Sequence, residues 1–464
     1  MILFIYISWR YLIKMEKDYK IIKQKKRNKI ILGKLFTSKD FIYMLVNVFA
    51  FALCIILTLV LPKKYDFNSY FDLKVFSAVI AVFILNVITN IIVRAIKLRK
   101  EDKEKLKEDY NELLSIYSTI TPVTYRNINS KNSKIGRKNT KCNYKQYNNQ
   151  EDEYKIPITE IVSFVNKEVN IVDNKDKFYQ LPEIVEKKIS EIYKAHDFSN
   201  TYNQLNIRCC GISQEDNKVQ LNFSRTNYYN SLLTNRAIDF KVDGLTIREL
   251  FAYGPFLQSL EESKLSNHIG FNGFIETIDG HIVFVFRHKK VSIAKNTMQT
   301  SVGASLKSKY ALNEKLELTK QGIVNAIKNE IKDELRLEKL ENYNQKESEI
   351  FSELSFNSVL GFYRELVEGG KPQLFFYTKI NVTSNELKQA YLKGVSKMQR
   401  MFEKTDLGYK VDGYKIFFIK KEELKEIYIS PDGMTIKGKF YKSVPTSTGT
   451  LALFINYLNN GDIV

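Results

Sequence analysis

The sequence predicts an α+β protein in which a mixed sheet lies between helices and follows a pair of membrane-spanning helices. Strand-like runs on both sides of Asp279-Gly280 and of Gly369-Gly370 predict two hairpins of the sheet. A helical pattern after the first hairpin, with an apolar residue at every fourth position, predicts a covering helix. Two uncharged apolar runs near the amino end predict the membrane pair.

The two apolar runs, residues 41–61 and 75–93, are long enough to cross a membrane. At about 1.5 Å per helical residue, each can span a hydrocarbon core of about 30 Å. Lys and Arg are concentrated on both outer flanks, whereas the loop between the runs is nearly neutral. By the positive-inside rule, both ends of the chain are predicted to be cytoplasmic. The alternative, two buried helices of a soluble core, is rare for neighbouring runs with charged flanks.

Two further helix predictions follow from local patterns. An apolar stripe from Leu106 through Tyr110 and Leu113 to Tyr117 predicts that a helix runs from Lys97 to Ile120. Ser447 or Thr448 is expected to cap the final helix.

Composition divides the chain into five segments. The segments are 1–40, basic and membrane-proximal; 41–95, the two transmembrane helices; 96–155, a juxtamembrane helix and polar linker; 156–270, the first part of the cytoplasmic domain; and 271–464, the part with the two hairpins.

Charge and motif content limit the classes of function. The formal net charge of +19 indicates an anionic partner, which could be a membrane surface, a nucleotide or a nucleic acid. The four cysteines have no spacing typical of zinc ligands, and the sequence has no HExxH, GxSxG or GxxxxGK[ST] motif. Zinc proteases, serine hydrolases and P-loop enzymes are therefore less favoured.

The predicted helix after the first hairpin carries acidic residues beside its apolar stripe. The stripe is formed by Ile323, Ile327, Ile331 and Leu335. Glu330, Asp333 and Glu334 lie at its edge, while the basic residues fall on the far side. Such a carboxylate cluster can hold Mg²⁺, although an acidic edge in contact with solvent is the simpler interpretation.

A hairpin, a Gly-containing loop and a helix with this acidic spacing resemble a Nudix domain. The string from Asn329 to Glu334 is similar to the Nudix box, and Gly303 resembles the glycine of the loop before it. The resemblance implies that Glu330, Asp333 and Glu334 bind a divalent metal such as Mg²⁺ in a Nudix-like mixed sheet. Asn329 stands where the family has Arg, which removes a bidentate partner of the first acid. Asp333 stands where the family has Glu, and Arg336 where it has Gly. Nucleotide binding without hydrolysis fits these departures better than catalysis.

A narrower resemblance covers the chain from about Phe223 to the carboxyl end. The strings RTNYYNSLLTNRAIDF, LTIREL and SKLSNHIGFNGFIETIDGHIVFVFRHKKV are similar to the SMODS-associated Nudix domain of effectors in CBASS anti-phage systems. This resemblance implies a bacterial inner-membrane effector that senses a cyclic oligonucleotide, assembles into a homo-oligomer and disrupts the bilayer. DNA is not an expected partner.

A polyanionic ligand needs cationic and stacking side chains, which the matching strings supply. For each single candidate, an ordinary surface or packing role is the competing interpretation. The candidate ligand-binding residues are Arg225, Tyr228, Asn267, Arg287 and His288.

Two other functions stay open from the sequence. A membrane-anchored Nudix hydrolase acting on a nucleoside diphosphate derivative would use the three helix acids. A scaffold that holds nucleic acid at the membrane would need only the bulk positive charge.

Overall fold

The structure, a computed structural model, describes residues 106–127, 153–194, 196, 203–287, 296–401 and 413–464. These residues fall within one compact unit. The predicted membrane runs at 41–61 and 75–93 lie outside the described residues. Within the described ranges, no helix is both long and apolar enough to cross a membrane.

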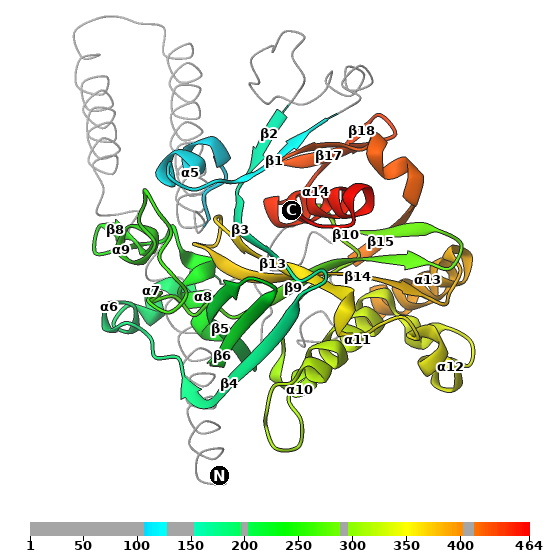
Figure 1. Cartoon of the computed structure of the whole chain (residues 1–464), viewed down its shortest axis with the longest axis horizontal. Helices are drawn as coiled ribbons and strands as arrows, with labels where there is room; N and C mark the ends of the chain where they lie inside the picture. The colour runs from blue at the N-terminus through cyan, green and yellow to red at the C-terminus, as the bar shows by residue number, and fades with distance from the viewer. Residues whose placement is uncertain (1–105, 128–152, 195, 197–202, 288–295, 402–412) are drawn as a thin grey trace, which may run out of the picture. The chain divides into compact units, whose positions relative to one another are not determined.

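Strands and helices are interspersed along the described chain (Figure 1). The strands are β1 (Val123–Arg126), β2 (Glu153–Ile156), β3 (Ile158–Ser163), β4 (Glu168–Phe178), β5 (Leu205–Glu215), β6 (Lys218–Asn227), β7 (Lys241–Val242), β8 (Leu245–Thr246), β9 (Gly270–Thr277), β10 (His281–Arg287), β11 (Met298–Gln299), β12 (Val302–Ser305), β13 (Val359–Glu365), β14 (Lys371–Ile380), β15 (Gly413–Lys420), β16 (Tyr428–Ser430), β17 (Gly433–Ile436) and β18 (Lys439–Lys442). The helices are α5 (Tyr110–Ile116), α6 (Glu183–Glu186), α7 (Ile189–Lys194), α8 (Tyr228–Leu233), α9 (Ile247–Phe251), α10 (Ser308–Ala311), α11 (Lys320–Leu335), α12 (Tyr343–Ile350), α13 (Ser384–Met401) and α14 (Pro445–Asn460), with short 3-10 turns η3 (Asn235–Ala237), η4 (Leu337–Lys339), η5 (Phe356–Ser358) and η6 (Lys421–Glu426).

A mixed sheet forms the centre of the unit. Its strand order is β11-β10-β9-β14-β13-β3, with β12 also paired to β9 and β15 to β10. The central pair, β9 and β14, is parallel, whereas the other described pairs of this sheet are antiparallel. The prediction of a mixed α and β protein is therefore confirmed, and smaller sheets such as β4-β6-β5 accompany the main one.

Helices cover both faces of the central sheet (Figure 1). Side chains alternate between the two faces of a strand, so Phe271 of β9 lies in the core with α11, while Phe274 lies in the core with α14. The Phe274 ring stacks on Phe454 of α14 with ring centroids 4.8 Å apart. Each fully buried Phe of this kind contributes about 1.5–3 kcal/mol of transfer free energy.

The two predicted hairpins and the acidic helix are confirmed. The β9–β10 turn contains Gly280 at φ 77°, and the β13–β14 turn contains Gly369 and Gly370 at φ 68° and 80°. Helix α11 begins after Thr319, whose side chain accepts a hydrogen bond from the Gly322 amide. These left-handed glycine positions and this cap are what the local sequence favours.

Arg336 ends α11 in the left-handed conformation, at φ 59°. Glycine adopts this conformation at lower cost, and Arg336 is the position at which the Nudix pattern has Gly. Its guanidinium lies 4.3 Å from the centre of the Tyr391 ring, and Nη1 donates to the Tyr391 carbonyl at 3.0 Å. The contacts with Tyr391 therefore help to hold the strained backbone.

Three local expectations need correction. Helix α14 begins at Pro445 with Val444 as its cap, because proline fits the first helical position, where no amide donor is needed. Ser447 and Thr448 are therefore buried inside the first turn, where Ser447 donates to Gln299 at 2.8 Å. The predicted polar linker contributes β1 and the first residues of β2, which pair with each other. Of the helix predicted from Lys97 to Ile120, the described part is helical only in α5.

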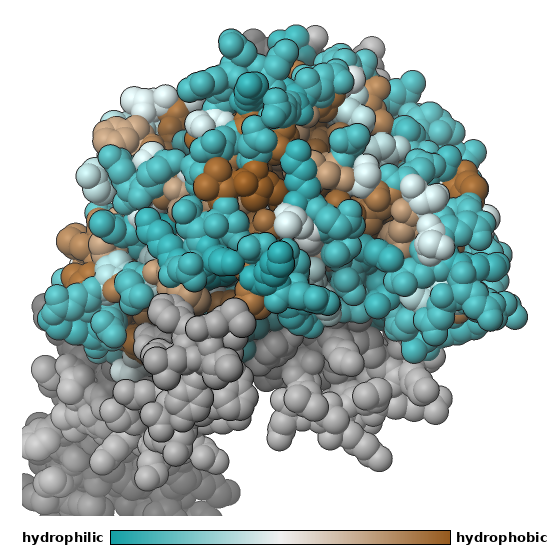
Figure 2. Space-filling model, turned by 60° about the horizontal axis from the view of Figure 1, so that its bottom comes forward, coloured by the Kyte–Doolittle hydropathy of each residue, from teal (hydrophilic) through white to brown (hydrophobic). Residues whose placement is uncertain are grey.

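One face of the molecule is mainly hydrophilic, and its apolar side chains form small patches (Figure 2). Charged and polar side chains dominate that face, in agreement with the composition. Other polar side chains are buried inside the unit, and a cluster of them forms the candidate site described below.

Candidate functional site: a buried polar network beside an acidic helix

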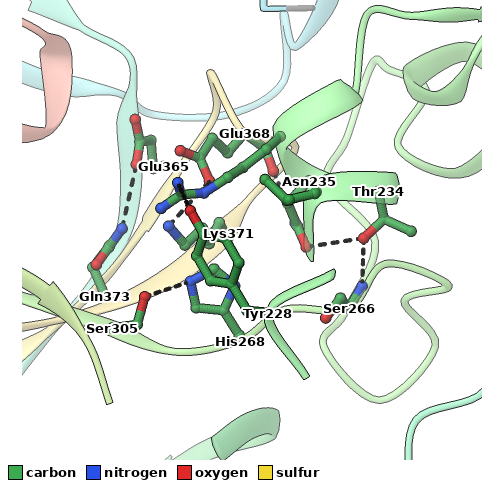
Figure 3. A network of polar contacts seen from close by, with 12 residues as sticks. Tyr228, Thr234, Asn235, Ser266, His268, Ser305, Glu365, Glu368, Lys371 and Gln373 are labelled. Atoms are coloured by element: carbon green, nitrogen blue, oxygen red, sulfur yellow. Dashed lines mark hydrogen bonds and ion pairs between the residues drawn. The ribbon is translucent and has the colours of Figure 1, made fainter. Parts of the chain in front are cut away.

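A cluster of polar side chains replaces the apolar core where β9 and β14 begin (Figure 3). Tyr228 comes from α8, His268 lies two residues before β9, and Glu368 lies in the β13–β14 turn. Lys371 begins β14, and Arg236 lies in η3. We call these five residues and Glu365 the polar network. Each of the six is less than a tenth exposed, so they interact at low effective dielectric.

The pKa values of two carboxyl groups of the polar network are shifted in opposite directions. Lys371 Nζ lies 3.0 Å from Glu368 Oε2. Burial opposes the charged form of Glu368, but Lys371 and Arg236 lower its pKa. Burial and the charge of Glu368 raise the pKa of Glu365 to about 7, and Gln373 donates to Glu365 at 3.4 Å. The turn therefore carries an ionised Glu368 beside a carboxyl that titrates near neutral pH.

Arg236 uses few of its hydrogen-bond donors. Nη1 donates to the Tyr228 hydroxyl at 2.8 Å, and the guanidinium carbon lies 5.2 Å from the centre of the Tyr228 ring. The closest approach of Nε to Glu368 is 3.9 Å, which is too long for a hydrogen bond. Within the described residues, Nε is buried without a hydrogen-bond partner. A guanidinium has five N–H donors, so Arg236 is a cation with capacity for a further acceptor.

The His268 ring is held neutral in the polar network. Burial and the charges of Lys371 and Arg236 hold the pKa of His268 well below its ordinary value. Its Nε2 is 3.0 Å from the Ser305 hydroxyl, whereas Nδ1 is buried without a hydrogen-bond partner among the described residues. The Tyr228 ring centroid lies 6.2 Å from that of His268. His268 therefore offers an unused ring nitrogen beside an aromatic face and two cations.

The acidic edge of α11 faces residues of the chain itself. Lys307 forms an ion pair with Glu330, whose pKa burial raises despite that lysine. The Tyr310 hydroxyl donates to Asp333 at 3.3 Å. Within the described residues, no group of three His, Cys, Asp or Glu side chains has an arrangement that could hold a metal ion. Glu330 and Asp333 therefore have a cation and a donor of the protein as their nearest partners.

Glu334 and Arg287 link this edge to the polar network. Burial and the charge of Glu330 raise the pKa of Glu334 to about 7, with Arg287 acting in the opposite direction. Burial lowers the pKa of Arg287 to about 10, and Glu334, Arg236 and Tyr228 are close enough to affect it. Arg287 and Glu334 are half-buried, so the polar network and the acidic edge of α11 together reach solvent at these two residues.

The structure separates the five predicted ligand residues. Tyr228 and Arg287 lie at the site, and His288 lies outside the described residues. Arg225 is 2% exposed and forms a bidentate ion pair with Asp173, so it has a structural role. Asn267 is fully buried. Its side-chain amide donates to the Ser263 hydroxyl at 2.8 Å, and its backbone amide donates to Asn235 Oδ1 at 2.8 Å.

The sequence analysis did not select Arg236, His268, Glu368 or Lys371. Arg236 and His268 lie within the strings that carry the resemblance, and Glu368 and Lys371 flank the Gly369-Gly370 turn. The sequence could have indicated Glu368 and Lys371, because they are oppositely charged residues on the two sides of a hairpin turn. No local pattern brings the turn next to Arg236, because the residues are more than 100 positions apart.

No protein-family model matches this chain, and a search of curated proteins finds no match. The family suggested by the sequence strings therefore stays a prediction.

Replacing Glu334 by Gln is expected to stabilise the protein more at pH 8 than at pH 5. The folded-state pKa of about 7 is above the unfolded value, so ionisation of Glu334 costs stability as pH rises from about 4.5 through 7. The cost at pH 8 is on the order of 1–3 kcal/mol for a half-buried group. Thermal unfolding of the whole chain in detergent micelles at both pH values would measure it.

Glu353→Gln is a matched control, because Glu353 is exposed. An equal change of melting temperature at pH 5 and pH 8 for Glu334→Gln would contradict the proposed ionisation of Glu334.

Proposed function

We propose that this chain is a membrane-anchored effector of a CBASS-type anti-phage system, with a domain that senses a cyclic oligonucleotide. In this proposal the central sheet and α11 form a Nudix-like domain on the cytoplasmic side of the bacterial inner membrane. Both termini are cytoplasmic, and the apolar runs at 41–61 and 75–93 span the bilayer. Ligand binding drives the chains to assemble, and the assembled membrane helices breach the membrane and end growth of the infected cell.

The observation that carries the ligand proposal is the unused capacity of buried Arg236. A buried guanidinium that donates one hydrogen bond to a neutral hydroxyl and stands 3.9 Å from the nearest carboxylate favours an anionic acceptor. A phosphodiester placed between Arg236 and Lys371 would replace Glu368 as the anionic partner of these two cations. Cyclic oligonucleotides offer such groups at a fixed spacing.

The remaining groups of the site fit a nucleobase. The Tyr228 ring supplies an aromatic face, and every base can stack on such a face. His268 is neutral, so its unused Nδ1 can bond to a base edge without adding charge. Phosphate and base would therefore be bound by different members of the polar network.

Binding without hydrolysis is favoured by the partners of the α11 acids. Glu330 pairs with Lys307, and Asp333 accepts from Tyr310. A divalent ion at these carboxylates would have to displace the lysine and the hydroxyl. The chain's own cation thus supplies the charge that Mg²⁺ would bring in a hydrolase of this type.

A second candidate, a metal-dependent Nudix hydrolase, is favoured by one feature. The pKa of Glu334 is raised to about 7, which suits a general base at neutral pH. This function predicts that turnover needs Mg²⁺ and is lost in Glu334→Gln.

Calorimetric titration of the whole chain in detergent micelles tests the proposal. The probes are cyclic di-AMP, cyclic di-GMP, cyclic GMP-AMP and cyclic tri-AMP, each with and without Mg²⁺, followed by chromatography for products. We expect one species to bind in the micromolar range or tighter, unchanged by the protein, and a linear diadenylate to bind at least tenfold more weakly.

The other outcomes separate the competing functions. Magnesium-dependent products that disappear in Glu334→Gln would favour the hydrolase. Binding of every probe alike, with steep weakening as salt rises, would favour a scaffold that uses bulk charge. No binding by any probe would reject the cyclic-oligonucleotide sensor.

A further inference from the structure

The turn between β13 and β14, residues Leu366 to Gly370, has two sides with different surroundings. Glu368, in its middle, belongs to the polar network through Lys371 and Arg236. Its backbone carbonyl also accepts from Asn235 at 2.9 Å. Two turn amides close the loop, Gly369 to the Leu366 carbonyl at 3.0 Å and Gly370 to the Glu365 carbonyl at 2.8 Å. The turn is thus a tightly bonded unit.

The other side of this turn carries helix α5. Leu366 and Val367 form a small apolar core with Leu113 and Tyr117, and the four side chains are between 0% and 7% exposed. Only Val367 separates Leu366 from Glu368 along the chain. The residues that hold α5 and the residue that pairs with the network cations are therefore neighbours in one short turn.

Arg248 of α9 fixes this contact by hydrogen bonds. It donates to the carbonyls of Leu366 and Val367, both at 2.8 Å, and to the Tyr117 hydroxyl at 3.1 Å. Its remaining donors form a bidentate pair with Asp239 at 2.7 and 2.9 Å. One buried guanidinium thus bonds the turn and the residue that follows α5 at the same time.

Asp239 extends the connection towards the start of the described chain. It accepts a hydrogen bond from the Lys107 backbone amide at 2.7 Å. Lys107 precedes α5 and lies close to the first described residue. The path from the polar network to the segment before α5 is therefore a continuous set of contacts through the turn, Arg248 and Asp239.

We infer that the Leu366–Gly370 turn passes the occupancy of the polar network to α5, so that ligand binding changes how α5 is docked. The identity of the ligand rests on the proposed function, whereas the connection itself does not. An anion bound by Arg236 and Lys371 leaves Glu368 as a buried carboxylate without its cations. Such a group has to move or take up a proton, and either change alters the turn under Leu113 and Tyr117.

Hydrogen exchange of the whole chain in detergent micelles tests the connection without any ligand. Glu368→Gln removes the charge that pairs with Lys371 and Arg236. We expect the amides of α5 to exchange at least severalfold faster in this variant, together with the amides of Gly369 and Gly370. Glu353→Gln, an exposed change on the surface, is expected to leave α5 exchange as in the wild type.

The conservative variant Tyr117→Phe tests the same connection from the other end. It removes the hydroxyl that bonds Arg248 and that donates to the Ala252 carbonyl at 2.6 Å, but keeps the ring in its core. Because coupling between two sites is reciprocal, the Gly369 and Gly370 amides are expected to exchange faster in this variant. If Glu368→Gln fails to fold, hydrogen exchange of Tyr117→Phe alone decides whether the turn and α5 are coupled.

Two results would overturn the inference. One is faster exchange at the turn in Glu368→Gln with α5 unchanged; the other is faster exchange in α5 in Tyr117→Phe with the turn unchanged. The cyclic-nucleotide titration tests the ligand and not the coupling. Absence of binding there rejects the proposed ligand, while the exchange data still decide whether the turn and α5 are coupled.

Discussion

Replacing Arg225 by Met is expected to destabilise the protein by about 3–5 kcal/mol, because it leaves Asp173, a carboxylate only 10% exposed, without its cation. Arg225 Nη1 and Nη2 donate to Asp173 at 2.6 and 2.8 Å, and Nη2 also donates to the Leu316 carbonyl at 2.9 Å. Asp173 accepts from the Leu318 amide as well, at 2.7 Å. These bonds join β4, β6 and the loop before α11. Thermal unfolding of the whole chain measures the loss.

The adjoining exposed pair gives a matched control. Lys175 and Glu317 lie 3.1 Å apart, and both side chains are 41% exposed. Lys175→Met is expected to cost less than about 1 kcal/mol, as for most surface ion pairs. If Arg225→Met kept its melting temperature but lost affinity for a cyclic oligonucleotide, Arg225 would be a ligand residue and the structural assignment would be wrong.

The second large effect is expected on ligand affinity. Arg236→Met should weaken binding of the cyclic oligonucleotide identified by titration by about 2–4 kcal/mol, roughly 30- to 1000-fold, because charged hydrogen bonds to a phosphate are lost. Glu368 keeps its ion pair with Lys371, so the melting temperature should change little. Titration of the variant and the wild type at one salt concentration measures the difference.

Lys339→Met controls for the loss of one positive charge. Lys339 is exposed on η4, and its Nζ lies 3.7 Å from the exposed Glu338 carboxylate. Equal weakening in Arg236→Met and Lys339→Met would mean that bulk charge, and not the polar network, binds the ligand.

Local sequence patterns were sufficient for the hairpins and for α11. The Asp279-Gly280 and Gly369-Gly370 turns need left-handed backbone, which glycine provides, and the apolar spacing of α11 leaves one orientation for its buried face. The start of α14 was misjudged because Ser447 and Thr448 are good caps in isolation, whereas Pro445 sets the first helical residue.

The site could not be assigned from local patterns. Arg225 and Arg236 stand in the same string, and only their distant neighbours distinguish them. Asp173 satisfies Arg225, while Arg236 has a carboxylate at 3.9 Å and a neutral hydroxyl. The acids of α11 were correctly placed at the edge of the apolar stripe. The contact between Lys307 and Glu330 depends on how α10 packs on α11. The periodicity of a single helix does not predict such packing.

Pairing of β3 with β13 has a consequence for synthesis of the protein. Ile158 pairs with Glu365 and Ser163 with Gly361, so roughly 200 residues separate the partners. At about 5–20 residues per second, a ribosome needs on the order of 10–40 s to make the second strand after the first. During that interval β3 lacks the strand with which it pairs in the folded protein, and an unpaired strand edge is prone to associate with other chains until β13 is made.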